Sequence, residues 1–186
     1  LSAPTVKPEL GVVKGGVLTL NMGTRASDRL YLNTEDSAES VILSGEANGV
    51  VDVEFLGFHK RFTGVTQVAV DMGAGNDTLI AEDDATAYGR EGNDSLTGSD
   101  NATVFGGEGD DYVLADGTGE AHGGAGNDFV WARNGASGFA AEGNDVVYAT
   151  QGSVANAGVG DDFGVATDRS QLYGGDGNDR LEVGSA

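Results

Sequence analysis

Between residues 71 and 182 the apolar positions recur with a constant period of 17 residues. Each unit holds two short stretches in which apolar and polar residues alternate, and this period of two indicates β-strands. A fixed period of this length is typical of a solenoid in which each repeat forms one turn. One apolar column consists of Leu79, Leu96, Val113, Val130, Val147, Gly164 and Leu181. The other consists of Ala87, Val104, Ala121, Gly138, Ala155 and Leu172. The pattern predicts a flattened two-layer roll with a thin aliphatic core and a local gap at Gly164.

Residues 16–70 alternate in the same way but do not repeat. Val51, Val53 and Phe55 alternate with acidic residues, and Gly57 marks a turn, so we expect short strands with a hairpin around 49–62. This section is interpreted as β-rich and continuous with the roll of residues 71–186. Residues 1–15 carry both prolines and are interpreted as a leader or linker. No window has helical periodicity, so the fold class is all-β.

Each repeat also carries a short loop in which a glycine precedes an aspartate by two residues. The glycines are Gly75, Gly92, Gly109, Gly126, Gly143, Gly160 and Gly177. The aspartates are Asp77, Asp94, Asp111, Asp128, Asp145, Asp162 and Asp179. Ca²⁺ takes six to eight oxygen ligands, about twice what one such loop offers, so two stacked loops supply a full shell. Glycine permits the positive φ angles that turn carbonyl groups inward. Seven loops enclose six spaces, and we expect up to about six Ca²⁺ in a file.

These loops resemble the G-G-x-G-x-D-x-U-x nonapeptide of the RTX (repeats-in-toxin) calcium-binding proteins over roughly residues 71–182. The resemblance implies a right-handed parallel β-roll or β-helix. It also implies that each ion lies between like loops of successive turns, held by both aspartates and by carbonyls of the glycine-rich positions. Those positions include Gly89, Gly106, Gly107, Gly123, Gly124, Gly174 and Gly175.

The chain departs from the RTX pattern in two respects. Typical rolls have 18 residues per turn with a nonapeptide on both sides, whereas here the other half of each turn has eight residues without the motif. We therefore expect one file of calcium rather than two. In addition, Arg90, Ala140, Ala141 and Ala157 stand where glycine is usual.

Composition narrows the possible partners. The formal net charge of −20 disfavours nucleic-acid binding, which needs a basic surface. Six Ca²⁺ would leave a net charge of about −8 and relieve the repulsion between stacked aspartates. The chain has no cysteine and no run of 18 apolar residues, so neither a thiolate site nor a membrane span is expected. Loops of this kind suit the calcium concentrations outside cells, and we expect a secreted or cell-surface fragment of a longer protein.

A further apolar column flanks the core residues and, by alternation, points away from the core. It consists of Tyr112, Leu114, Phe129, Trp131, Val146, Tyr148, Phe163 and Val165. An exposed apolar patch of this size usually marks an interface. We expect the N-terminal section or a neighbouring domain to cover it, with self-association or another partner as the alternatives.

The sequence favours a non-catalytic calcium-binding module with a structural or adhesive role. His59 and His122 are isolated and are interpreted as surface residues, and no nucleophile elbow occurs. A polysaccharide-modifying β-helix enzyme, or its accessory module, is the alternative, because carboxylate pairs are plentiful. An ice-binding solenoid is disfavoured because the loops lack an outward column of threonine. Asp28 faintly matches the aspartate position of a further loop, although a plain turn fits better.

Overall fold

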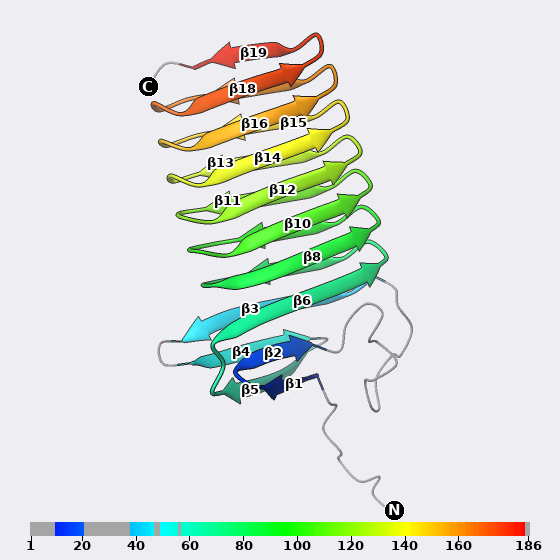
Figure 1. The fold of residues 1–186 in the computed structure, drawn as a ribbon, viewed down its shortest axis with the longest axis vertical. Helices are drawn as coiled ribbons and strands as arrows, with labels where there is room; N and C mark the ends of the chain where they lie inside the picture. Colours follow the sequence, from blue (N-terminus) through cyan, green and yellow to red (C-terminus); the bar gives the residue numbers. More distant parts are fainter. Residues whose placement is uncertain (1–9, 21–37, 47–48, 56, 185–186) are drawn as a thin grey trace, which may run out of the picture.

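A computed structural model describes residues 10–20, 38–46, 49–55 and 57–184 (Figure 1). Within them the chain is all-β and winds into a β-solenoid of about seven turns, with like positions of successive turns 17 residues apart. Asp28 and the segment around it lie outside the described residues. Among the described residues, no helix is long and apolar enough to cross a membrane.

Two sheets face one another along the stack (Figure 1). In spatial order, the first comprises β1 (Gly11–Lys14), β2 (Val17–Leu20), β6 (Gln67–Ala74), β8 (Ala85–Glu91), β10 (Thr103–Glu108), β12 (Glu120–Ala125), β14 (Ser137–Glu142), β16 (Val154–Val159) and β18 (Gln171–Asp176). The second comprises β19 (Arg180–Val183), β17 (Phe163–Ala166), β15 (Val146–Ala149), β13 (Phe129–Arg133), β11 (Tyr112–Asp116), β9 (Ser95–Gly98), β7 (Thr78–Ala81), β3 (Ser40–Glu46), β4 (Val50–Phe55) and β5 (Phe58–Thr63).

The strands of successive repeats pair in parallel, and each residue lies opposite the equivalent residue of the next repeat, 17 positions further along the chain. Val113 of β11 pairs with Val130 of β13, which in turn pairs with Val147 of β15. Because a shift of one residue would turn every core side chain outward, the strict period of the sequence fixes this register. The predicted pairing of one repeat with the next is confirmed.

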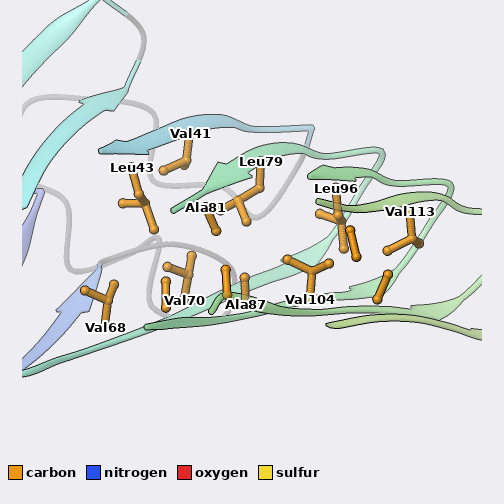
Figure 2. Close-up of a cluster of buried hydrophobic side chains, with 14 of the residues drawn as sticks. Val41, Leu43, Val68, Val70, Leu79, Ala81, Ala87, Leu96, Val104 and Val113 are labelled. Carbon is orange, nitrogen blue, oxygen red and sulfur yellow. The ribbon is translucent and has the colours of Figure 1, made fainter. Parts of the chain in front are cut away.

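The two predicted apolar columns meet between the sheets and form the core. Leu79, Leu96 and Val113 project from one sheet toward Val70, Ala87 and Val104 of the other, and all six are buried (Figure 2). In the column that begins at Leu79, only the residue of the last turn is exposed: the side chain of Leu181 is 44% exposed. The gap expected at Gly164 is absent, because Leu172 of the facing sheet fills that space.

The N-terminal strands continue both sheets at one end of the stack. β2 pairs in parallel with β6, and β3 pairs in parallel with β7. The hairpin expected around 49–62 is confirmed: β4 and β5 pair antiparallel, with Phe55 opposite Phe58. β1 begins at Gly11, inside the stretch interpreted as a linker, and pairs with β2. The division into segments 1–15, 16–70 and 71–186 stays a prediction.

Both outer faces carry ladders of aromatic rings. On the second sheet Tyr112 stacks on Phe129 at 5.0 Å between ring centroids, and Phe129 stacks on Tyr148 at 5.4 Å. Neighbouring rings cover much of one another, so Phe129, Trp131 and Tyr148 are half-buried and Leu114 is buried. The described N-terminal strands extend the sheets at the end of the stack and do not lie over this face (Figure 1).

Candidate metal centre

All seven motif loops lie along one edge of the solenoid, because each one leads from a strand of the first sheet to the next strand of the second. We number the positions of each loop so that the motif aspartate is position 6. The aspartates from Asp77 to Asp162 are 1–3% exposed, whereas Asp179 in the last turn is only half-buried. The fold therefore brings six of the predicted aspartates into one buried column, and Asp179 lies at its less buried end.

The motif aspartates link successive turns through a hydrogen-bonded ladder. The backbone N–H of each aspartate donates to Oδ1 of the aspartate in the following turn. The N···O distances are 2.7–2.8 Å up to Asp162 Oδ1 and 3.2 Å at Asp179 Oδ1. At the N-terminal end, the N–H of Glu39 donates to Oδ1 of Asp77 at 2.7 Å, so β3 joins the ladder.

Position 5 forms a second ladder that runs in the opposite direction. Each turn has Asn or Asp there, and its side-chain oxygen accepts from the position 5 N–H of the following turn at 2.7–3.2 Å. The residues are Asn76, Asn93, Asp110, Asn127, Asn144, Asp161 and Asn178. Asn and Asp are typical of tight turns, and this sequence preference alone accounts for their presence in the loop. These residues also hold adjacent turns together. That role becomes visible only once the structure shows which residues are stacked.

One oxygen of each inner carboxylate has no hydrogen-bond partner. The Oδ2 atoms of Asp94, Asp111, Asp128, Asp145 and Asp162 are buried and accept no hydrogen bond. Unpaired buried polar atoms are costly in native proteins and therefore need a physical reason. A column of such atoms along one edge is what a row of cations would require.

Burial raises the pKa of these carboxyl groups. It raises the pKa of Asp128 to about 7 and those of Asp111 and Asp145 to about 6. Burial also raises the pKa values of Asp94 and Asp162. In each case the ladder N–H opposes the shift, because it donates to the charged form. The column thus resists holding negative charge unless positive charge is supplied.

The glycines serve two different purposes. Those at position 4 all have positive φ, from 125° to 147°, and a Cβ at Gly109 would collide with the carbonyl oxygen of Gly92. The expectation of positive φ is confirmed there and at position 2, where even Arg90 and Ala141 have φ angles of 91° and 92°. At position 1, Gly89, Gly106, Gly123 and Gly174 do not have positive φ, and what their missing Cβ leaves is space for the carboxylate of the same loop.

The donor set fits calcium rather than a transition metal. Among the described residues, no three His, Cys, Asp or Glu side chains converge on one point. The carboxylates therefore need backbone carbonyl oxygens to complete a shell, and this mixture is what Ca²⁺ accepts. His122 does not belong to this donor set. It stacks between Phe105 and Phe139 and is hydrogen-bonded to Glu120, so its side chain is less exposed than expected for a surface residue.

The opposite edge is built differently. Its turns have a left-handed residue every 17 positions, from Asp83 (φ 58°) to Asp168 (φ 52°). Polar side chains there bind one another: Arg133 and Asn134 both donate to Asp116, at 2.9 and 2.6 Å. Arg133 Nε lacks a partner, but no carboxylate oxygen of that edge is both buried and without a hydrogen bond among the described residues.

Comparison with known proteins agrees with the loop geometry. The family model of the RTX calcium-binding nonapeptide repeat matches four copies, over residues 81–113, 115–136 and 167–185. Neither a curated protein nor a solved structure is similar enough to the chain to match. The chain therefore carries calcium-binding repeats of the RTX family, with four copies matched between residues 81 and 185.

Proposed function

We propose that residues 71–182 bind calcium in a single file along the loop edge and act as a non-catalytic, calcium-stabilised module. The ligands are the motif aspartates, Asp77 to Asp179, and carbonyl oxygens of the glycine-rich positions, including those of Gly75 to Gly177 at position 4. Six spaces between seven loops accommodate about six ions. The column of buried Oδ2 atoms without hydrogen-bond partners carries this proposal.

Charge supports the same conclusion. The formal net charge is −20, and the motif carboxylates are stacked at intervals of one turn, a parallel-strand spacing of about 5 Å. Like charges this close repel strongly when water is excluded. Divalent ions between the turns convert this repulsion into attraction, since each ion then contacts two loops.

The cellular role follows from the calcium requirement. We propose that the module belongs to a secreted bacterial protein, as is typical of proteins with RTX repeats, and that it folds where calcium is abundant. It then serves as a structural or adhesive segment. His122 is stacked between Phe105 and Phe139 and hydrogen-bonded to Glu120. No observation on the described residues favours a polysaccharide-modifying enzyme.

We also propose that the aromatic face of the second sheet, centred on Tyr112, Trp131 and Tyr148, is an interaction surface for a neighbouring domain or a second copy. Tyr112 is 39% exposed and the described N-terminal strands leave this face open. Sedimentation analysis in calcium, repeated with Tyr112→Ser, tests the second copy. A monomer at all concentrations would leave the neighbouring domain as the occupant.

Direct measurement of bound metal tests the calcium proposal. The chain, dialysed against millimolar CaCl₂ and then analysed for metal, should retain several ions, and Mg²⁺ should not replace them because it demands tighter, near-octahedral ligands. No retained calcium would reject the proposal. Crystals with anomalous scatterers along both edges would reject the single file.

A further inference from the structure

The seven loops differ at position 1, five residues before the motif aspartate. Gly89, Gly106, Gly123 and Gly174 have no side chain there, whereas Met72, Ala140 and Ala157 do. All three of these side chains are fully buried, so they point into the structure rather than into solvent. The column is therefore split, and the loops beginning at Ala140 and Ala157 are adjacent.

In the glycine loops the space beside position 1 is taken by the carboxylate. A Cβ at Gly89, Gly106 or Gly123 would overlap Oδ2 of the same loop's aspartate, namely Asp94, Asp111 or Asp128. The same Cβ would also lie 2.5–2.8 Å from the position 1 carbonyl oxygen of the following turn. An unpaired carboxylate oxygen and a carbonyl of the next turn thus approach the same point, as two ligands of an ion between turns would.

Ala140 and Ala157 carry a methyl group at position 1, and in the geometry of the glycine loops a Cβ there would occupy that point. The ladder hydrogen bonds to Oδ1 of Asp145 and Asp162 persist at 2.8 Å, so the aspartates keep their place in the column. Because Oδ1 is held by the ladder, Oδ2 is the oxygen that has to move to make room for the methyl group. These oxygens remain buried and without a hydrogen bond, but they cannot take the position that glycine allows in the other loops.

The family comparison divides the loops in the same way. The four matched copies include every loop with glycine at position 1. The loops beginning at Met72, Ala140 and Ala157 fall outside the matched residues. Arg90 at position 2 does not prevent a match, so the division follows position 1 and not the number of glycines.

We propose that position 1 decides which spaces of the roll bind calcium tightly, so that the file of tightly bound ions ends at the loop beginning at Ala140. This inference rests on the proposed calcium function. The spaces that start from the loops of Gly89, Gly106 and Gly123 bind tightly. Those that start from Met72, Ala140 and Ala157 bind weakly or stay empty, and buried side chains hold those turns together instead.

Counting ions in matched variants of the full chain tests this proposal. Titration calorimetry with CaCl₂, combined with metal analysis after dialysis, should find about three tight ions in the unmodified chain. Ala140→Gly with Ala157→Gly should raise the number to about five. Gly106→Ala with Gly123→Ala should lower it to about one. As the control, Ala149→Gly with Ala155→Gly removes two buried methyl groups away from the loops and should leave the number unchanged.

The possible results separate the two proposals. Six equally tight ions in the unmodified chain, or an unchanged number in the Ala140→Gly and Ala157→Gly variant, would overturn the role of position 1 while leaving calcium binding intact. No binding in any variant would overturn calcium binding itself. If the alanine substitutions at Gly106 and Gly123 prevent folding, the gain expected on replacing Ala140 and Ala157 still decides the matter.

Discussion

The backbone N–H of Asp111 donates a hydrogen bond to Oδ1 of Asp128 in the next turn, 2.8 Å away. In the adjacent position the N–H of Asn127 donates at 2.7 Å to Oδ1 of Asp110, in the preceding turn. Each interface between loops is thus joined by side chains from both sides, one pointing up the stack and one pointing down. The arrangement leaves Oδ2 of Asp128 free for a cation while Oδ1 holds the backbone.

Asp128→Ala should destabilise the calcium-bound roll more than Asp179→Ala does. Asp128 is buried, belongs to two spaces and accepts the Asp111 N–H, whereas Asp179 is half-buried in the last turn and accepts at 3.2 Å. Leaving a buried N–H without an acceptor costs about 1–3 kcal/mol. Urea unfolding in CaCl₂ measures the difference, and equal losses at both positions would argue against shared ligands.

Asp128→Asn separates the ladder from the charge. Asparagine keeps an oxygen that can accept the Asp111 N–H but carries no charge. In EDTA at neutral pH we expect Asp128→Asn to be at least as stable as the unmodified chain, because a costly buried charge is gone. In calcium it should be less stable, because a ligand has been weakened. A loss of stability in both conditions would mean that the carboxylate is mainly structural.

Acid should stabilise the metal-free roll, the opposite of ordinary acid denaturation. The pKa values of Asp111 and Asp145 are raised to about 6 and that of Asp128 to about 7, against an ordinary value of 3.8. Between pH 3.8, the ordinary pKa of an aspartate, and about pH 7 the folded chain binds more protons than the unfolded chain. The free energy of unfolding therefore falls as pH rises. The stabilisation is complete below about pH 4 and is lost by about pH 7.

Thermal melts in EDTA at pH 5 and pH 8 check this expectation. The roll should show a melting transition at pH 5 that is lower or missing at pH 8, and Asp128→Asn should reduce the difference because one titrating group is removed. Saturating calcium should abolish the preference for acid, since the metal then competes with protons for the same oxygens. A metal-free roll that is more stable at pH 8 would contradict the burial of these carboxyl groups.

The repeat, the two core columns and the metal edge could be predicted from sequence because each depends on a strict period. Register follows once Val113 and Val130 must occupy like places in successive turns, and Asp111 and Asp128 then stack automatically. The hairpin joining β4 to β5 was also accessible, since alternation around Val53 and the turn at Gly57 are local signals. Such features require no knowledge of how side chains pack across the sheets.

Features that depend on contacts between turns could not be predicted. Gly164 was expected to leave a gap, but Leu172 reaches across from the other sheet to fill it. The ladder through Asn127 and the stack of His122 between two phenylalanine rings follow from three-dimensional proximity. The sequence does not distinguish the glycines of position 1 from the other loop glycines. In the structure they make room for a carboxylate and do not adopt positive φ.

Glycine at position 2 should stabilise the roll wherever another residue now has positive φ. Ala141 has φ of 92°, a region that costs a residue with a Cβ about 1–3 kcal/mol. Ala141→Gly relieves this strain but adds freedom to the unfolded chain, which offsets about 0.5–1 kcal/mol. We therefore expect a net gain of about 1 kcal/mol by urea unfolding. The contrasting change, Gly126→Ala, should be destabilising because its Cβ would overlap the carbonyl of Gly109.

Calcium should act as the folding switch of residues 71–182 at neutral pH. Ordering the backbone costs about 1–2 kcal/mol per residue, and the repeat core offers only small side chains such as Ala87 and Ala121 against buried, unpaired carboxylate oxygens. Metal that binds only the folded chain adds roughly 2.7 kcal/mol per site at 100 times Kd, enough over several sites to decide the equilibrium. The N-terminal strands should persist without calcium, because Leu43 and Phe55 give them a core of larger side chains. Circular dichroism at pH 8 should therefore show partial β structure in EDTA and a cooperative gain on titration with Ca²⁺. Full β signal and an unchanged melting temperature in EDTA would show that calcium binds a roll that is already folded.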